Sequence, residues 1–498
     1  MNAVNKTTCA PYNPSQTWKA INWLLVEKRV KQLQMRIAKA VREGKYGKVQ
    51  SLQWILTHSY YAKLLAVKRV VTNKGKKTSG VDGVIWKTPK QKMEAVKTLK
   101  RRGYRPLPLR RVHIPKKRNS KKKRPLGIPT MRDRAMQALY SLALIPVSET
   151  VADINSYGFR EERCCQDAIE QCYIALAKTI SATWILEGDI VSCFDEINHK
   201  WLLDNIPIDK KILQLWLKAG YIDNKRRFPT EKGTPQGGII SPIISNMTLD
   251  GLEKTVREAV PKGSKVNFIR YADDFIVTCV NKEIIVDKII PTVKSFLLER
   301  GLKLSPEKTL ITHIENGFDF LSQTVRKYDG KYLTKPSKKA IKSFMDSIRK
   351  IIRSMRGASA EALIKRLNAA IRGWVNYHKH IVAKHTFRCI DSQIYSLLVR
   401  WAKRRHSKKS WHWICSKYFR HGTIKGAFSI KVKTKKKGVY KIYQIYKAAY
   451  TPIRRHIKIR QLANPYDPEY KSYFEQRRKF KRFRAYECRQ ITTHLAKA

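Results

Sequence analysis

The chain has 498 residues, 43% of them hydrophobic, which is enough for three or more packed units rather than a single core. Its 103 Lys and Arg against 38 Asp and Glu give a net charge of +65, and self-repulsion on that scale destabilises a compact chain unless a polyanion neutralises it. The sequence has no apolar run of about 18 residues, and we expect no signal peptide. Its basic charge extends along the whole chain, so composition favours nucleic acid over an anionic membrane as the partner.

Helices are predicted first, over residues 18–70, where apolar side chains recur at helical spacing. The side chains expected on buried helix faces are Trp18, Ile21, Leu24, Leu25, Leu52, Ile55 and Leu56. A loop rich in Gly, Lys and Thr follows at 72–83, and residues 104–129 alternate basic and apolar positions around a turn. That alternation predicts a β-hairpin whose tip carries Lys and Arg.

The central part of the chain alternates predicted helices and strands. The expected elements are helices near 131–150 and 165–180, a strand at Trp184–Ile190, a helix at His199–Ala219, a Gly/Pro loop at Gly233–Pro242 and a strand–turn–strand at Val266–Val280. This mixture predicts an α+β sheet domain that extends to about residue 327.

Beyond Pro336 the pattern becomes helical. The apolar face of a first helix, which Gly357 ends, comprises Ile341, Phe344, Met345, Ile348, Ile352 and Met355. Two more helices are expected at about 360–377 and 386–404. After Lys403 the chain becomes basic and aromatic, a pattern that suits stacking on single-stranded or distorted nucleic acid. The aromatic residues of this segment are Trp411, Trp413, Tyr418, Phe480 and Phe483.

The nine cysteines include no C-x-x-C pair. Cys164 and Cys165 are adjacent, and the others are scattered. This distribution predicts reduced thiols rather than a disulfide framework or a zinc site.

An acidic pair lies at the turn of the predicted hairpin, in the segment FIRYADDFIV (268–277). Neighbouring carboxylates raise each other's pKa, and a divalent cation such as Mg²⁺, which prefers oxygen ligands, offsets that repulsion. Asp189, at the end of a predicted apolar strand, is a third candidate ligand. We therefore predict that Asp189, Asp273 and Asp274 hold two Mg²⁺ ions for in-line nucleotidyl transfer. The alternative interpretation is a solvated turn and a helix-capping acid.

Several segments of this chain resemble group II intron-encoded proteins, from about residue 18 to residue 475. The segments that carry the resemblance are TSGVDG (78–83), RPLGIPTMRDRAMQ (124–137), SYGFREERCCQDAI (156–169), GDIVSCFDEINH (188–199), GTPQGGIISP (233–242), RYADDF (270–275), GLKLSPEKT (301–309), GFDFL (317–321) and RLNAAIRGWVNYHKH (366–380). The resemblance implies a right-hand polymerase of fingers and palm, followed by an α-helical thumb and a basic DNA-binding region. It implies fingers and palm with an N-terminal extension at 1–327, a maturase-specific thumb at 328–412 and the DNA-binding region at 413–498.

The resemblance also implies roles for individual residues. Asp189, Asp273 and Asp274 would be catalytic, with Ile190 beside them in the metal site. Phe194 would lie under the sugar of the incoming nucleotide and exclude a 2′-hydroxyl, its alternative being a core phenylalanine. The remaining nucleotide-binding residues would be Lys116, Arg124, Gln236 and Gly237, and Lys116 has the alternative of a general RNA-backbone contact. The residues expected to contact RNA or DNA are Arg132, Lys308, Arg372, Trp374, Tyr377, Lys403, Arg404 and Arg405. Trp374 and Tyr377 have the alternative of core packing.

The function that this resemblance implies is RNA-directed DNA synthesis together with maturase activity. The expected cofactor is Mg²⁺, two ions per site, with Mn²⁺ as a substitute. The expected partners are the group II intron RNA, an RNA template with a DNA primer, target DNA and dNTP, with no membrane and one copy per ribonucleoprotein. The expected location is the bacterial cytosol or nucleoid, with an organelle as the alternative.

One departure from many relatives concerns DNA cleavage. The segment NPYDPEYKSYFEQR (464–477) resembles the lead-in to an HNH endonuclease, but no paired cysteines or H-N-H cluster follow it. We therefore expect no second-strand cleavage, so that intron mobility by target-primed reverse transcription would use a primer from another source. Two other functions remain open: a splicing-only RNA-binding cofactor, and a domesticated reverse transcriptase in DNA repair or defence.

Overall fold

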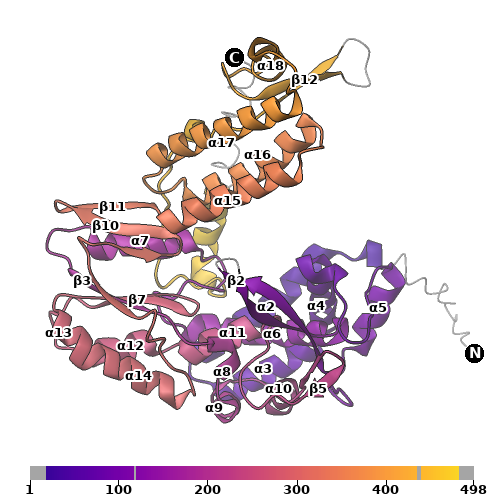
Figure 1. Ribbon diagram of the computed structural model, residues 1–498. Helices are drawn as coiled ribbons and strands as arrows, with labels where there is room; N and C mark the ends of the chain where they lie inside the picture. Colours follow the sequence, from indigo (N-terminus) through magenta and orange to yellow (C-terminus); the bar gives the residue numbers. More distant parts are fainter. Residues whose placement is uncertain (1–17, 117–118, 434–438, 482–498) are drawn as a thin grey trace, which may run out of the picture. The chain divides into compact units, whose positions relative to one another are not determined.

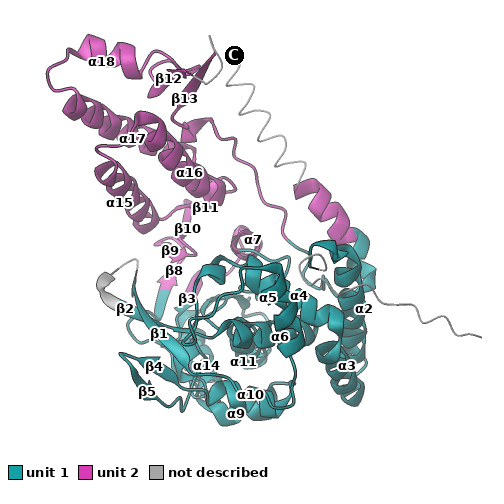
Figure 2. Cartoon of the chain, turned by 90° about the vertical axis from the view of Figure 1, so that its right-hand side faces the viewer, with its two compact units in different colours: residues 1–164, 186–311, 459–472 teal, residues 165–185, 312–458, 473–498 magenta. Residues whose placement is uncertain are grey.

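The computed structural model describes residues 18–116, 119–433 and 439–481, without the side chains of 116–122. The chain divides into two compact units, each built from segments that are distant in sequence (Figure 2). Unit 1 comprises Met1–Cys164, Leu186–Ile311 and Ile459–Ser472, and unit 2 comprises Cys165–Ile185, Thr312–Lys458 and Tyr473–Ala498. In the ranges described, no helix is both long and apolar enough to cross a bilayer.

One buried helix organises the N-terminal part of unit 1. Helix α6 (Met131–Val151) begins at Thr130, whose hydroxyl accepts a hydrogen bond from the backbone N–H of Asp133, and nearly all of its side chains are buried. Helices α2 (Trp23–Arg42), α3 (Tyr46–His58) and α4 (Tyr60–Thr72) pack against it (Figure 1). The predicted helical region is therefore confirmed, with α5 (Pro89–Thr98) as a helix that the sequence pattern did not indicate.

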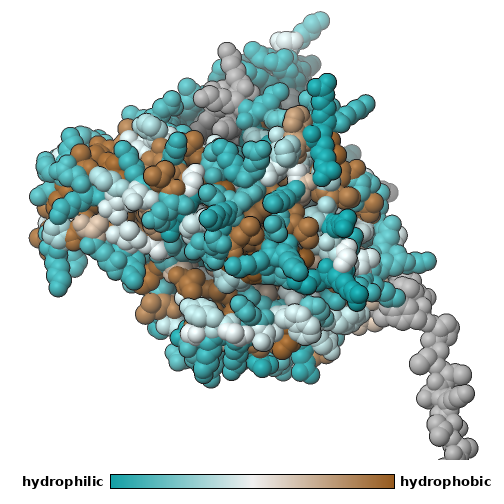
Figure 3. All heavy atoms as spheres, turned by 90° about the horizontal axis from the view of Figure 1, so that it is seen from below, coloured by the Kyte–Doolittle hydropathy of each residue, from teal (hydrophilic) through white to brown (hydrophobic). Residues whose placement is uncertain are grey.

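The predicted buried faces in this region are wrong at several positions. Leu24 is 81% exposed and Ile55 is 44% exposed. The buried stripe of α2 runs instead through Val26, Val30, Gln34 and Ile37, which recur every three to four positions along the helix. Exposed apolar side chains also occur outside these helices, for example at Val382, Ile442 and Leu462. Figure 3 shows brown patches between the hydrophilic side chains on the face that it draws.

The predicted basic hairpin is present. Strands β1 (Leu109–Lys116) and β2 (Asn119–Ile128) pair antiparallel, with Val112 opposite Leu126. The hairpin belongs to a four-stranded sheet in the order β2-β1-β4-β5, completed by β4 (Tyr221–Asp223) and β5 (Arg226–Phe228). The pairing of β1 with β4 is parallel, so this connection brings two distant segments together.

A second four-stranded sheet, in the order β6-β7-β3-β8, carries the acidic segments. Its strands are β3 (Trp184–Gly188), β6 (Asn267–Tyr271), β7 (Asp274–Cys279) and β8 (Leu310–His313). The helices α11 (Ser241–Leu249), α12 (Leu252–Glu258) and α14 (Ile290–Glu299) of unit 1 were not recognised in the sequence. They bury apolar side chains such as Ile244, Leu252 and Leu297.

The helix predicted at His199–Ala219 is wrong as a single element. It is two helices, α9 (His199–Asn205) and α10 (Lys210–Leu217). Pro207 lies between them and has no backbone N–H to donate, and Asp209 caps the second helix by accepting from the N–H of Ile212.

Unit 2 combines a small sheet with a group of helices. Strands β9 (Phe318–Phe320), β10 (Gln323–Tyr328) and β11 (Lys331–Pro336) form an antiparallel sheet in the order β11-β10-β9. Helix α7 (Cys165–Leu176) contacts this sheet through Tyr173, whose ring lies 5.4 Å from that of Tyr332. The domain boundary predicted after residue 327 falls inside β10, because the strand pattern continues to Pro336.

The three helices predicted after Pro336 are confirmed. They are α15 (Lys338–Ser354), α16 (Ala360–His378) and α17 (Lys384–Arg405), which lie side by side in Figures 1 and 2. The predicted face of α15 is buried at Phe344, Met345, Ile348 and Ile352. Met355 is only half-buried because it caps the helix rather than belonging to it.

The segment after Arg405 has more tertiary structure than its composition indicated. Helix α18 (Trp411–Tyr418) and strands β12 (Ser429–Lys433) and β13 (Tyr440–Gln444) form it. Tyr418 was expected to stack on nucleic acid, but it is 3% exposed and stacks on Phe428, with ring centres 5.3 Å apart. It is therefore a core residue, whereas Trp411 remains 43% exposed. Phe483 lies outside the described residues.

The buried histidines of unit 2 predict a pH-dependent stability. Burial lowers the pKa of His378 from 6.5 to about 3, and burial together with the charge of His456 lowers the pKa of His380 to about 4. Between pH 6.5 and these values the unfolded chain binds protons that the folded chain does not, so stability is lost as the pH falls below 6.5. Each histidine then contributes a loss of about 2 kcal/mol at pH 5.

Thermal unfolding of the full chain at pH 7.5 and pH 5 tests this expectation. The double variant His378→Asn/His380→Gln should lose clearly less stability on acidification than the wild-type chain. The variant His412→Gln, at an exposed position, is the control and should behave like the wild type. An unchanged acid sensitivity in the double variant would contradict the assignment.

Candidate active site

A tight turn between two buried strands presents the acidic pair. In the antiparallel pairing of β6 with β7, Tyr271 lies opposite Asp274, so that Ala272 and Asp273 form the turn. Ala272 has a φ of 59°, in the left-handed region that non-glycine residues rarely adopt. The turn places Asp274 in an exposed position and leaves Asp273 half-buried.

The neighbouring strand brings Asp189 to the same end of the sheet. A Cβ on Gly188 would lie 2.2 Å from the ring of Phe275, so only glycine allows β3 to lie this close to β7. The backbone after the strand is fixed by a hydrogen bond from the N–H of Ser305 to the carbonyl of Asp189, 2.8 Å long. Ile190 continues this contact as an antiparallel bridge to Leu304.

The electrostatics of these acids match a cation site. Burial raises the pKa of Asp273, and the negative charge of Asp189 raises it further, while Arg124 and Lys308 act in the opposite direction. The ammonium group of Lys308 lies 2.5 Å from Oδ2 of Asp189. Lys308 therefore neutralises part of the negative charge that a divalent cation would neutralise. Carboxylate oxygens are ligands that Mg²⁺ prefers, so these acids fit that ion.

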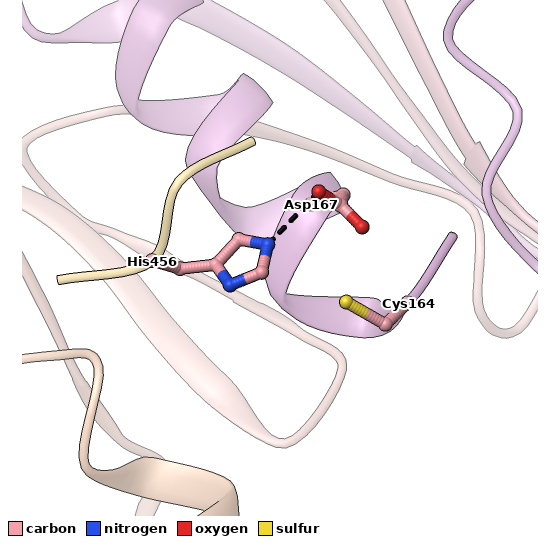
Figure 4. A group of neighbouring side chains, drawn as sticks. All are labelled: Cys164, Asp167 and His456. Carbon is pink, nitrogen blue, oxygen red and sulfur yellow. Dashed lines mark hydrogen bonds and ion pairs between the residues drawn. The ribbon is translucent and has the colours of Figure 1, made fainter. Parts of the chain in front are cut away.

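The carboxylates of Asp189, Asp273 and Asp274 do not lie within one ligand sphere. Among the described residues, the set of possible metal ligands whose atoms all lie within 4.8 Å of one another is the group that includes Asp167 and His456. Figure 4 shows the ring of His456 pointing at the carboxylate of Asp167, 2.9 Å away. Arg477 also donates to Asp167, at 3.0 Å, so this second carboxylate is already paired with protein cations inside unit 2.

A glycine-rich loop is fastened beside the acids from two sides. The N–H of Thr234 donates to the carbonyl of Phe194 at 2.6 Å, and the N–H of Gly127 on β2 donates to the carbonyl of Gln236 at 2.9 Å. Gly237 has a φ of 128°, and a Cβ there would lie 2.6 Å from the carbonyl oxygen of Gly127. This loop therefore needs glycine to lie against the hairpin.

The side chain of Gln236 is bound to an acid that the sequence reasoning had not selected. Its amide donates to Oδ2 of Asp195 at 2.7 Å. Burial raises the pKa of Asp195, while Arg111, the amide of Gln236 and Arg124 lower it. The signal that could have identified Asp195 is its place six residues after Asp189 in the segment GDIVSCFD.

The other predicted nucleotide-binding residues surround these acids. Arg124 is exposed on β2, and its charge acts on both Asp195 and Asp273. Phe194, in the single-turn helix α8 (Cys193–Glu196), is half-buried, and its ring lies edge-on to that of Phe159, 6.4 Å away. Lys116 ends β1, and its side chain lies outside the described residues.

The residues predicted to contact RNA or DNA fall into two groups. The exposed ones are Arg132, Lys308, Arg372, Lys403, Arg404 and Arg405. Trp374 instead stacks on Phe344 with ring centres 4.8 Å apart, and the hydroxyl of Tyr377 donates to the carbonyl of Leu321 at 2.8 Å. These contacts favour the alternative of core packing for Trp374 and Tyr377.

A fully buried guanidinium lies behind the acidic turn, and the sequence reasoning missed it. Arg270 precedes the turn on β6 and is ion-paired with Asp250. One of its nitrogens also lies 3.5 Å from the carbonyl of Ala272, within the turn. Burial raises the pKa of Asp250 to about 6, although the charge of Arg270 opposes this rise.

Three known protein families match segments of this chain that contain these residues. The family profile described as reverse transcriptase (RNA-dependent DNA polymerase) matches residues 114–325, and the N-terminal domain of reverse transcriptase matches 18–99. A group II intron maturase-specific domain matches 341–419.

Among curated proteins, the group II intron-encoded protein LtrA of Lactococcus lactis is 32% identical over 334 residues, covering 53% of this chain and 54% of LtrA. Protein YkfC of Escherichia coli is 33% identical over 311 residues, covering 54% of this chain and 81% of YkfC. The chain thus spans about half the length of LtrA. Among solved structures, a telomerase of Candida albicans aligns with a TM-score of 0.36 at 11% identity, covering 63% of this chain and 64% of that one.

The contact between Gly158 and the acidic turn predicts a substitution that disturbs the site without touching an acid. A Cβ at this position would lie 2.3 Å from the backbone nitrogen of Ala272, so Gly158→Ala must displace the turn. We expect a loss of stability of about 1–3 kcal/mol and clearly weaker binding of Mn²⁺, measured by electron paramagnetic resonance. Gly47→Ala, where nothing lies within 4 Å of the added carbon, is the matched control. Normal Mn²⁺ binding by a folded Gly158→Ala protein would exclude the turn as the cation site.

Proposed function

Since this chain belongs to the family of group II intron-encoded reverse transcriptases, we propose that it is an RNA-directed DNA polymerase that also binds intron RNA as a maturase. The observation that carries the proposal is the meeting of Asp189 and Asp273 at one end of a sheet, where the negative charge of Asp189 raises the pKa of Asp273. The net charge of +65 supports an RNA or DNA partner, because many phosphates are needed to neutralise it.

The proposed reaction is the attack of a primer 3′-hydroxyl on the α-phosphate of a dNTP. Asp189, Asp273 and Asp274 would hold Mg²⁺, or Mn²⁺ in its place, in the site that also includes Ile190. When bound, two such ions lower the pKa of the attacking hydroxyl and stabilise the leaving pyrophosphate. The chain itself supplies Arg124, whose exposed guanidinium would bind the triphosphate in a bidentate manner. Lys308, now against Asp189, would turn to the primer or template phosphates once a metal replaces it.

The incoming nucleotide would bind between the hairpin and the glycine-rich loop. Gln236 is oriented by Asp195, so its backbone and that of Gly237 are presented in a fixed position. Lys116 would add a further cation from the same hairpin. The ring of Phe194 follows Asp189 by five residues and would fill the space that a ribose 2′-hydroxyl needs.

In the proposed architecture, residues 1–327 form fingers and palm with an N-terminal extension. The hairpin β1–β2 would act as fingers, and the sheet β6-β7-β3-β8 would act as the palm. Residues 328–412 would form the thumb, in which α15, α16 and α17 bind RNA, and residues 413–498 would form a DNA-binding region. Intron mobility by target-primed reverse transcription and action in the cytosol belong to the same proposal, as does one protein copy per intron RNA.

Removal of one acid tests the polymerase separately from the RNA-binding role. Asp273→Asn should reduce Mg²⁺-dependent primer extension on poly(rA)/oligo(dT) by at least about 100-fold, because a ligand of the cation is lost. RNA binding should stay unchanged, since the exposed cations are untouched. Asp287→Asn, at an exposed position, is the control for loss of a negative charge. Primer extension at the wild-type rate in Asp273→Asn would exclude this site, and the chain would then be a splicing cofactor.

A second substitution tests sugar selection. Phe194→Val should raise the incorporation of rNTP relative to dNTP by roughly 10- to 200-fold, because the removed ring atoms make room for one hydroxyl. Single-nucleotide extension with dTTP and rUTP measures this ratio. Phe228→Val, in the exposed strand β5, is the control. An unchanged ratio would assign Phe194 to the core instead.

A further inference from the structure

A segment near the C-terminus, Ile459–Ser472, packs within unit 1, although the residues on either side of it in sequence belong to unit 2. We call it the C-terminal strap. Most of it lies outside helices and strands, yet its buried side chains include Ile459, Ala463, Tyr466 and Asp467. Connecting segments usually lie on the surface because their backbone groups need water, so this burial indicates a specific role in packing. The strap overlaps the segment NPYDPEYKSYFEQR (464–477), whose resemblance to an endonuclease lead-in gives it no part in the polymerase.

Tyr466 anchors the centre of the strap. Its side chain is 1% exposed, and its hydroxyl donates to Oε2 of Glu161 at 2.8 Å. The ammonium group of Lys31 lies 3.6 Å from the centre of its ring, which adds a cation–π contact. Further contacts of the strap with unit 1 are a hydrogen bond from the amide of Asn464 to the hydroxyl of Thr150, at 3.1 Å, and an ion pair between Asp467 and Arg42.

The strap is also hydrogen-bonded to residues 153–163, a loop that we call the support loop. The amide of Gln461 donates to Oδ1 of Asn155 at 3.4 Å, near the beginning of this loop. The guanidinium of Arg163, at its end, donates to the carbonyl of Gln461 at 3.0 Å. Together with the bond from Tyr466, these contacts restrain the support loop near both of its ends.

The support loop lies against the strand that carries the acidic turn. The N–H of Arg270 on β6 donates to the carbonyl of Asn155, and the N–H of Tyr157 donates to the carbonyl of Arg270, both at 2.9 Å. A Cβ on Gly158 would lie 2.3 Å from the backbone nitrogen of Ala272, so the loop and the turn are in direct contact. A shift of the support loop therefore also shifts the turn that presents the acidic pair.

We infer that the C-terminal strap is a positioning element of the polymerase site, in which Tyr466 acts through Glu161 and the support loop to hold the acidic turn. The turn contains Ala272 at a positive φ, and Asp189 repels Asp273, so contacts from outside the sheet stabilise this conformation. The inference rests on the proposed function and extends it. It assigns residues 459–472, which lie in the region predicted to bind DNA, to the polymerase instead.

Mn²⁺ binding and hydrogen exchange of the full-length protein test the inference. The variant Asn464→Ala/Tyr466→Phe removes two side-chain donors of the strap and keeps the buried ring. Leu462→Ala/Glu469→Gln changes two exposed residues of the strap and is the matched control. Leu213→Ala, at a buried position of α10, is the control for a general loss of stability.

The strap variant should bind Mn²⁺ at least about threefold more weakly, as measured by electron paramagnetic resonance. Amide exchange in peptides that cover residues 268–275 should be at least about fivefold faster, because the turn opens more often. Both controls should keep the Mn²⁺ affinity of the wild type, although Leu213→Ala unfolds at a lower temperature. Equal weakening of Mn²⁺ binding by Leu213→Ala would overturn the inference, as would unchanged binding and exchange in the folded strap variant.

Substitution of Glu161 tests the route through the support loop. Glu161→Gln and Glu161→Ala remove the same charge, but only the glutamine keeps an oxygen that can accept from Tyr466. Glu161→Gln should therefore keep Mn²⁺ affinity within about twofold of the wild type, whereas Glu161→Ala should weaken it as much as Tyr466→Phe does. The double variant Glu161→Ala/Tyr466→Phe should bind no more weakly than either single variant, since both lose one shared bond. Additive losses would exclude this route.

Primer extension separates this inference from the proposed function. The strap variant should need at least about threefold more Mg²⁺ for half-maximal extension and should approach the wild-type rate at saturating Mg²⁺. A wild-type chain that binds Mn²⁺ but extends no primer would overturn the polymerase proposal, while Mn²⁺ affinity and amide exchange would still decide the role of the strap. Extension by the wild type with an unchanged Mg²⁺ requirement in the strap variant would overturn the strap alone.

Discussion

The acidic turn depends on a guanidinium that has no access to solvent. Burying an ion is unfavourable unless an opposite charge and hydrogen bonds accompany it. The guanidinium of Arg270 has both, through Asp250 and through hydrogen bonds to Asn246 and the carbonyl of Ala272. The backbone of Arg270 is also hydrogen-bonded to Asn155 and Tyr157. These contacts fix the strand that ends in Tyr271. The strained residue Ala272 is consequently held in place, and Asp273 stays close to Asp189 despite their repulsion.

The glycine-rich loop connects the acids to the hairpin. It is bonded to the backbone of Phe194 on one side and to Gly127 on the other, so a movement of the hairpin also moves Gln236. Asp195, which follows Phe194 in the chain, adds a further link to the loop by accepting a hydrogen bond from the Gln236 side chain. A nucleotide that binds between them would thus contact groups whose positions are set together, which favours a preorganised site.

The chain has far more Lys and Arg than Asp and Glu, and several of its acids are buried in ion pairs. The buried acids are used inside the fold, as in the pairs Arg160–Glu149 and Arg477–Asp167. In unit 2, for example, six arginines line one cavity between α15 and α17, and among the described residues one acid, Asp346, is ion-paired with any of them. A polyanion bound beside these cations would reduce their mutual repulsion.

The amino-acid sequence by itself determined the basic hairpin, the acidic turn, Asp189 and the three helices after Pro336, because each depends on a local pattern of apolar and polar residues. It did not determine which apolar positions are buried, as Leu24 and Tyr418 show, since burial depends on which distant elements pack nearby. The contacts of Lys308 with Asp189 and of Gln236 with Asp195 join residues 119 and 41 positions apart. The two rows of arginines likewise line one cavity only because α15 packs against α17, since periodicity places side chains on a face but does not identify the surface opposite that face.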